Sequence, residues 1–467
     1  MDRREFTKKI GVTIAGIPFA SSFMGLANKQ ESVLLRKNIE SLNADEIANY
    51  KHALTILKER NNNEKNSYYS LAQMHNTSDI QYRCKHLSDL FLPWHRGMLY
   101  HFEQELQKTD PPRTSNVTIP YYDFTKVPLE GKRFPAVFED TNSILGMRWS
   151  LINGWTKNNR EVNSPSNNPP LIPPRDINDL MNLNWVDFGG DKGKPGKIEI
   201  PHNTMHNEGI GGVFLSTYTS ANDPLFWSFH TFIDLIFWRW QRESSYTIPE
   251  SRFDEELKFK GIWDDMKFGD TIDVAELGYS YEYKTEDLFT ADKRLAVYGA
   301  AQAEGSFAQN NPFIAGLANK NKINWTETFP LSPIKNQFSK AVFKLSDFVH
   351  LENHNITGFL YLHPSGEKFK PRSPLFIERY LIDYLSIFGM KSMGGMEMRS
   401  DYSFDLTGEM RRLSQLGKSE KWTITLALSI ESLSFSKELD DVKSKPASKS
   451  VAEQMMKIRN GELQYII

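Results

Sequence analysis

The sequence has almost no cysteine, since Cys84 is the only one among 467 residues. An internal disulfide framework is therefore excluded. The chain also lacks a large excess of charge of either sign, because 56 basic and 58 acidic side chains leave a formal net charge of −2. So small a net charge gives no reason to expect nucleic acid or an anionic membrane as a partner.

The N-terminus lacks a hydrophobic run long enough for a transmembrane helix. Its first 27 residues, MDRREFTKKIGVTIAGIPFASSFMGLA, have a basic start, a short apolar stretch and small residues near Ala27. This layout is typical of a cleaved export signal. Arg3 and Arg4, followed by Glu5-Phe6 and Lys8, favour the twin-arginine type; an ordinary secretory signal or a disordered basic terminus is the alternative. We expect export by the twin-arginine machinery to the periplasm or medium, and no stable membrane anchor.

What the chain does have is a helical pattern followed by a strand pattern. NADEIANYKHALTILKER has apolar residues at helical spacing after the potential cap Asn43. The very aromatic stretch 221–242 predicts a buried helix capped by Asn222 or Asp223. Between 336 and 436, segments such as WTITLALSIESLSF alternate apolar and polar residues, which predicts half-buried strands.

Two histidines in PHNTMHNEGIGG lie four residues apart, so a helix would present His202 and His206 on one face. Many such pairs bind nothing. His230 lies in the predicted buried helix, where an unpaired imidazole would be costly. Asp234 follows one turn later and would hold a ring or order the site. These positions together suggest a three-histidine site.

A second candidate site lies in CKHLSDLFLPWHRG. His86 and His95 would face opposite sides of a continuous helix. Pro93 is not accepted in a helix interior, so we expect His86 on a loop and His95 in the first turn of the following helix. His75, after the helical YYSLAQM, is the third candidate, although spacing alone does not show that the three converge.

Three neutral imidazoles at each site suit borderline metals such as copper or zinc. Di-iron bundles need several glutamates and two Glu-x-x-His pairs, and this combination is not found here, since Glu199–His202 is the single such pair in the chain. A single three-histidine zinc site remains the simpler alternative. Elsewhere, His350 and His354 lie in a strand-like pattern and are not assigned to a site. A glycine-rich loop carries four methionines whose thioethers would suit copper(I) during loading, although a plain loop is the simpler interpretation: Met390, Met393, Met396 and Met398.

Four motifs in this order resemble the type-3 copper proteins, namely tyrosinases, catechol oxidases and molluscan haemocyanins. CKHLSDLFLPWHRGMLYHFE resembles the copper A signature, and PHNTMHNEGIGG resembles the start of the copper B signature. DPLFWSFHTFIDLIFWRW resembles the end of the copper B signature, and LGYSYEY resembles the Tyr-x-Tyr motif of polyphenol oxidases. The match covers about 40–285, and the C-terminal region resembles, more faintly, the β-sandwich of plant and fungal polyphenol oxidases.

The resemblance implies an α+β fold: a mainly α-helical catalytic domain with a four-helix bundle around a dicopper centre, followed by a β-sandwich. The expected organisation is a signal at 1–27, the dicopper domain at 28–285, a linker at 286–335, the β-sandwich at 336–436 and a polar tail at 437–467. The implied activity is oxidation of o-diphenols to o-quinones with O2, with ortho-hydroxylation of monophenols left open. An o-aminophenol oxidase and a haemocyanin-like O2 carrier are the alternatives. The oligomeric state is not predicted.

The resemblance also implies roles for single residues. Two copper ions would be held by His75, His86 and His95 and by His202, His206 and His230. Glu199 and Asn203 would orient a water that helps deprotonate the phenol, although Glu199 lies one residue closer to the histidine than in plant enzymes. The expected pocket or gate residues are Thr217, Phe226, Asn207 and Phe229.

Two further features concern Phe229 and Cys84. The family usually has His-His where this chain has Phe229-His230; the ligand is the second residue, so the metal site survives and packing or substrate preference changes. Cys84 matches the cysteine that some members link by a thioether to the histidine two positions later, here His86. A small buried residue is the alternative interpretation of Cys84.

Overall fold

The structure, a computed structural model, describes residues 33–466 except 76–81, 83, 127–133, 151–153, 158–159, 161–173, 284–317, 319–321, 332–336, 352, 389–396, 416–420, 436–441 and 457–459. The predicted export signal, much of the predicted linker and three of the four loop methionines lie outside the described residues. Within the described part, no helix is both long and apolar enough to cross a membrane.

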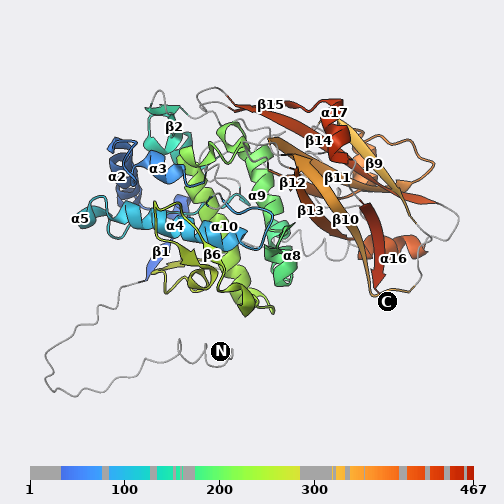
Figure 1. Cartoon of the computed structure of the whole chain (residues 1–467), viewed down its shortest axis with the longest axis horizontal. Helices are drawn as coiled ribbons and strands as arrows, with labels where there is room; N and C mark the ends of the chain where they lie inside the picture. Colours follow the sequence, from blue (N-terminus) through green and yellow to red (C-terminus); the bar gives the residue numbers. More distant parts are fainter. Residues whose placement is uncertain are drawn as a thin grey trace, which may run out of the picture. The chain divides into compact units, whose positions relative to one another are not determined.

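Helices dominate the first half of the chain, drawn in blue and green in Figure 1. They are α2 (Ala44–Glu59), α3 (Tyr68–Ala72), α4 (Phe91–Gln107), α5 (Pro111–Thr114), α6 (Ala136–Glu139), α7 (Pro174–Leu180), α8 (Trp185–Gly189), α9 (Glu199–Thr204) and α10 (Pro224–Glu243). Shorter helical turns are η1 (Ile39–Ser41), η2 (Ile144–Gly146), η3 (Met205–Ile210), η4 (Gly212–Leu215), η5 (Ser220–Asn222), η6 (Glu250–Arg252) and η7 (Phe268–Thr271). Small strand pairs accompany them: β1 (Leu34–Arg36) with β8 (Tyr279–Tyr281), β2 (Met147–Ser150) with β3 (Gly154–Lys157), β4 (Gly190–Asp191) with β5 (Lys194–Pro195), and β6 (Glu256–Leu257) with β7 (Met266–Lys267).

Local sequence signals explain where the main helices begin. Asn43 caps α2 in a reciprocal capping box with Glu46, as the sequence predicts. Asp223, rather than Asn222, caps α10, and Pro224 occupies its first helical position. α4 begins at Phe91, so Pro93 is its third residue and His95 lies beyond the first turn. The expectation that the helix begins after Pro93, with His95 in its first turn, is therefore wrong. The first backbone amides of a helix have no carbonyl partner within it, so proline is tolerated at its third position.

Helices α4 and α10 form the centre of the helical part. Their side chains meet in three places: Phe102 stacks on Trp227 with ring centroids 3.5 Å apart, His95 stacks on His230 at 4.7 Å, and Arg96 binds Asp234. Because residue numbers broadly rise along α4 as they fall along α10, the two helices are antiparallel. Both helices are buried along most of their length, which explains the aromatic sequence of α10.

Two antiparallel sheets form the C-terminal part, drawn in orange and red in Figure 1. Their elements are β9 (Trp325–Pro330), β10 (Lys340–Leu351), β11 (His354–Pro364), α15 (Pro374–Tyr380), β12 (Leu381–Ile387), β13 (Glu397–Asp405), α16 (Thr407–Gln415), β14 (Trp422–Phe435), β15 (Val442–Pro446), α17 (Lys449–Met456) and β16 (Asn460–Ile466). One sheet has the order β13-β10-β16, and the other has the order β12-β11-β14-β15 with β9 also paired to β14. The predicted α+β architecture, helical part first and β-sandwich second, is confirmed.

Strand β11 lies between two hydrophobic cores. Leu360 and Leu362 pack in the core between the sheets, whereas Phe359 and Tyr361 join the core of the helical part. Successive side chains of a strand point to opposite faces, so the larger sheet is covered on both sides. The sheet that carries β12 therefore packs directly against the helices that carry the site.

The segment predicted as a polar tail contains secondary structure. Strand β15 pairs with β14, and the last strand, β16, pairs with β10 from Lys340↔Ile466 to Ser346↔Asn460. The described residues of this segment therefore belong to the two sheets and are not an unpaired tail. Their polarity reflects the position of these strands at a sheet edge, where an exposed charged residue such as Lys445 also discourages further pairing.

Candidate metal centre

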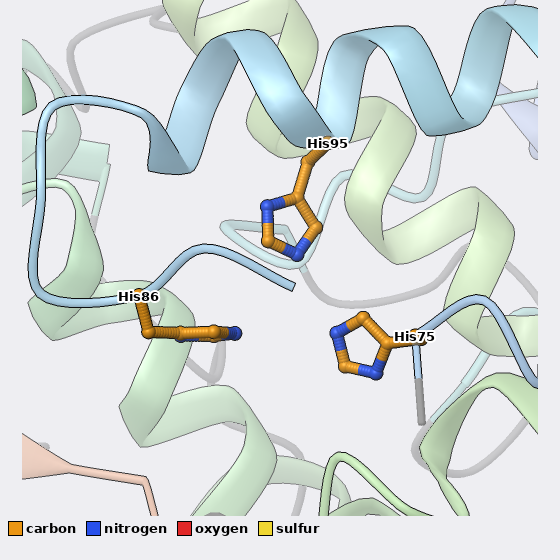
Figure 2. A group of neighbouring side chains, drawn as sticks. All are labelled: His75, His86 and His95. Atoms are coloured by element: carbon orange, nitrogen blue, oxygen red, sulfur yellow. The ribbon is translucent and has the colours of Figure 1, made fainter. Parts of the chain in front are cut away.

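Three separate segments bring the first triad, His75, His86 and His95, to one point (Figure 2). His75 follows α3, His86 lies on the loop before α4, and His95 projects from α4 itself. One nitrogen from each ring lies within 4.8 Å of the others. The fold thus brings the three histidines together, which their spacing in the sequence did not show.

The second triad, His202, His206 and His230, comes from three helical elements, of which the first two are consecutive. His202 lies in α9, His206 lies in the π-helical segment η3, and His230 lies in the middle of α10. Their nitrogens also lie within 4.8 Å of one another. Single π-helical turns of this kind are frequent at functional sites, because they re-aim a side chain along an otherwise regular helix.

The two triads face each other. The rings of His86 and His202 have centroids 5.3 Å apart, and those of His75 and His230 are 5.9 Å apart. The stacked pair His95 and His230 joins α4 to α10 at the same place. The chain thus builds one centre with two neighbouring sites rather than a single three-histidine site.

Hydrogen bonds at Nδ1 fix the orientation of four rings. His75 donates to the Thr217 carbonyl at 3.0 Å, His95 to the Phe91 carbonyl at 2.7 Å, and His206 to the Phe214 carbonyl at 2.8 Å. His202 donates to the side-chain oxygen of Asn203 at 2.9 Å. Each bond places the proton on Nδ1 and leaves the Nε2 lone pair available to a metal.

Burial keeps these imidazoles neutral. It lowers the pKa of His75 to about 4 and that of His206 to about 3, and it holds the pKa values of His95, His202 and His230 well below the ordinary range. Nearby rings add to the effect at these last three positions. Neutral imidazole is the form that binds metal.

The donor set fits a pair of metal ions. Five rings of the two triads bury an Nε2 that has no hydrogen-bond partner among the described residues, namely His75, His95, His202, His206 and His230. A buried polar atom without a partner is costly, and the gathering of these five in one place is what a metal-binding centre requires. Imidazoles without thiolate or carboxylate ligands suit copper or zinc.

Asp234 does not hold the ring of His230, as one interpretation of the sequence suggested. Its carboxylate accepts hydrogen bonds from Arg96, Arg36, Tyr279 and Tyr281. Burial alone would raise the pKa of Asp234, but the charges of the two arginines outweigh it and the pKa is lowered. Asp234 thus joins α10 to Arg96 of α4, the neighbour of His95, within a buried ionic cluster.

Glu199 and Asn203 are engaged with different partners. Glu199 Oε2 accepts the Leu87 amide at 3.0 Å, and Asn203 donates through Nδ2 to the Ser386 carbonyl at 2.9 Å. Burial raises the pKa of Glu199 to about 8, while the amides of Leu87 and Ser88 oppose that rise. No hydrogen bond joins Glu199 to Asn203 in the described part of the chain.

The expected pocket residues surround the triads. Phe226 packs against His230 with ring centroids 4.3 Å apart, and against His75 at 4.7 Å. Phe229 stacks on His202 at 5.5 Å with an angle of 20° between the rings. The buried Thr217 contributes its carbonyl to His75, a contact that the predicted gate role did not include.

Phe388, which the sequence motifs do not include, covers the second triad. Its ring stacks on His206 with centroids 4.1 Å apart, and it also lies 6.0 Å from His86 and 6.3 Å from His202. It directly follows β12, whose Ser386 and Ile387 accept hydrogen bonds from Asn207. No local signal marks Phe388, because only the long-range packing of β12 places it there.

Comparison with known proteins extends these observations. A model of the common central domain of tyrosinase matches residues 65–185 and 153–243, which include all six histidines. Tyrosinase HcTyr1 of Hahella sp. is 24% identical over 266 residues, which are 48% of this chain and 57% of that protein. The chain thus spans little more than half of that relative's length.

Two solved structures share the fold of nearly the whole chain. Latent apple tyrosinase has a TM-score of 0.60 at 15% identity, covering 89% of this chain and 98% of that one. A functional unit of octopus haemocyanin has a TM-score of 0.59 at 16% identity, covering 92% and 99%. At these identities the likeness concerns the fold alone.

Proposed function

The chain belongs to the tyrosinase family of type-3 copper proteins, and on that premise we propose that it is a copper oxidase converting o-diphenols to o-quinones with O2. The two facing histidine triads are the observation that carries this proposal. Each triad would hold one copper ion through the Nε2 atoms. Bound copper would supply O2 binding and the electron transfer that diphenol oxidation requires.

The protein's own residues would prepare the site for that chemistry. Hydrogen bonds at Nδ1 hold the rings in position before metal arrives, so little reorganisation accompanies binding. The aromatic walls Phe226 and Phe229 exclude water from the centre. Glu199 and Asn203 as organisers of a water, and Thr217 as a gate, remain predictions. The thioether between Cys84 and His86 is likewise proposed, and resistance of Cys84 to alkylation in the denatured protein would support it.

The proposed oxidase would be closed in this structure. Phe388 presents an aromatic face to His206, the geometry that a phenol ring would adopt there. Asn203 and Asn207 hold the neighbouring strand by three hydrogen bonds of 2.9 to 3.1 Å. The apple tyrosinase that shares this fold is a latent enzyme, which supports a closed form here.

Turnover by the full-length, copper-loaded protein tests the oxidase proposal. We expect O2 consumption with catechol and two coppers per chain by metal analysis. Two zinc ions per chain, or reversible O2 binding without turnover of catechol in an opened variant, would refute it. The second outcome would favour the haemocyanin-like alternative.

Phe388→Ala tests the closed form in the full chain. Removing the ring should raise catechol turnover and leave copper content unchanged. Leu375→Ala is the matched control, because Leu375 is 72% exposed in the same domain. Equal rates for wild type, Phe388→Ala and the control would show that Phe388 does not close the site.

An o-aminophenol oxidase is the second candidate, and Phe229 favours it. This residue replaces the family's usual histidine and lies flat against His202. If Phe229 sets the preference, Phe229→His should shift the ratio of catechol to o-aminophenol turnover toward catechol. An unchanged ratio would remove Phe229 from substrate selection.

A further inference from the structure

The backbone is strained next to a ligand of the first triad. Leu87 follows His86 and has φ of +55°, in the left-handed region that side chains other than glycine rarely adopt. Leu87 is buried, so its side chain is fixed as well. Such a conformation persists only where the surroundings hold it, and it decides the direction in which the preceding residue points.

One carboxylate holds this residue. The Leu87 amide donates to Glu199 Oε2 at 3.0 Å, and Glu199 is 1% exposed. The same oxygen lies 3.8 Å from His86 Nδ1, beyond hydrogen-bond distance. Glu199 therefore acts on His86 through the backbone of Leu87 rather than through the ring.

Glu199 lies where its contact with Leu87 connects the two triads. Glu199 is the first residue of α9, three residues before His202 of the second triad. Its side chain thus joins the loop of the first triad to the helix of the second. The rings of His86 and His202, which it connects, have centroids 5.3 Å apart.

We infer that Glu199 is a positioning residue that holds the strained Leu87 turn and thereby sets His86 opposite His202. This role requires a hydrogen-bond acceptor at Glu199, not a proton-accepting base. The inference rests on the proposed dicopper function where it is tested by measuring copper binding. A role in orienting water would instead require the carboxylate itself.

Two substitutions of Glu199 separate these roles. Glu199→Gln keeps an oxygen for the Leu87 amide, so copper binding at the first triad should stay at the wild-type level. Glu199→Ala removes the acceptor and should weaken that copper about 10- to 100-fold, the effect usual for groups that orient ligands. Loss of copper from Glu199→Gln equal to that from Glu199→Ala would overturn the inference.

A second substitution at Leu87 tests whether copper binding can be restored in Glu199→Ala. Glycine adopts positive φ without strain, whereas alanine does not. In the Glu199→Ala protein, an added Leu87→Gly change should restore more copper binding than Leu87→Ala, although both remove all of the buried leucine side chain beyond Cβ. Equal binding by the two double variants would contradict the role of the strained turn.

Hydrogen exchange of the Leu87 amide tests the contact without copper. In the metal-free protein this amide should be protected in wild type and Glu199→Gln, and should exchange faster in Glu199→Ala. Unchanged protection in Glu199→Ala would refute the inference. If wild type binds no copper while the exchange pattern holds, the dicopper proposal fails and the positioning contact stands.

Discussion

Asp234→Asn removes the centre of the buried ionic cluster beneath α10. The carboxylate accepts from Arg96 Nε at 2.5 Å, Arg36 Nη1 at 3.1 Å, Tyr279 OH at 2.7 Å and Tyr281 OH at 2.5 Å. Both arginine side chains are 0% exposed. Glu103, which binds Arg36 at 2.9 Å, would then be the remaining carboxylate of the cluster.

The magnitude follows from this charge balance. Two guanidinium groups face two carboxylates in the wild type, and one carboxylate after the substitution. Removing one partner of a buried ion pair costs about 3–5 kcal/mol, because the other charge stays buried. The asparagine also turns an NH2 group toward hydrogen-bond donors. Against a typical total stability of about 5–15 kcal/mol, such a loss is large.

Urea unfolding of the metal-free protein at pH 7, followed by tryptophan fluorescence, measures this loss. The midpoint should fall with little change in slope. Asp191→Asn is the matched control, since Asp191 is exposed, and its effect should stay within about 0.5 kcal/mol. A loss below about 1 kcal/mol for Asp234→Asn would refute the charge argument, because it falls well short of the cost of a broken buried pair.

The pH dependence gives a second check on the same variant. The pKa of Asp234 is lowered in the folded chain, so its contribution to stability is present above the ordinary aspartate pKa and is lost as pH falls through the folded value. The difference between wild type and Asp234→Asn should therefore be largest near neutral pH. It should shrink in strong acid, and a difference that grows there would contradict the assignment.

Three further predictions concern other parts of the molecule. Burial raises the pKa of Asp123 to about 6, so ionisation of this carboxyl destabilises the folded chain as pH rises from about 4 to 6. Asp123→Asn should therefore increase the free energy of unfolding in urea by up to about 3 kcal/mol at pH 7.5 and by little at pH 4. An equal increase at both pH values would contradict this. In Gly358→Ala, the new Cβ would lie 2.8 Å from Leu385 Cγ and 2.9 Å from Leu428 Cδ2, so overpacking should cost about 1–3 kcal/mol, and an unchanged melting temperature would refute it. Copper at about 100 times its dissociation constant should stabilise the metal-free protein by about 2.7 kcal/mol and a chelator should reverse this; no shift on copper addition would count against the site.

Local sequence signals predicted several elements of the fold well. The cap at Asn43, the proline start of α10 and the alternation of β14 all depend on neighbours within a few residues. The histidines were found for the same reason, because their spacing within motifs is local. Convergence of His75 with His86 was not predictable from spacing, since the two residues lie on separate segments, one after α3 and one before α4.

Signals from distant contacts were missed. Phe388 reaches His206 only because β12 pairs with β11 and packs against α9, and nothing near residue 388 reports that packing. The polarity of 442–446 and 460–466 suggested a tail because edge strands need few apolar residues. Pro93 was misjudged because its tolerance depends on where the helix begins, which is two residues earlier.

The arrangement of β11 and β12 bears on how a closed site would open. Departure of the whole sheet would expose Phe359 and Tyr361, which belong to the core of the helical part. Burying a large aromatic side chain contributes about 1.5–3 kcal/mol, so separation of the whole sheet from the helical part would be costly. Displacing Ser386 to Phe388 alone would break three hydrogen bonds and one ring stack, at about 1 kcal/mol for each, together with the pairing of Ser386 and Ile387 to β11. The balance of these costs favours local movement of the end of β12 together with Phe388, with the rest of the sheet in place.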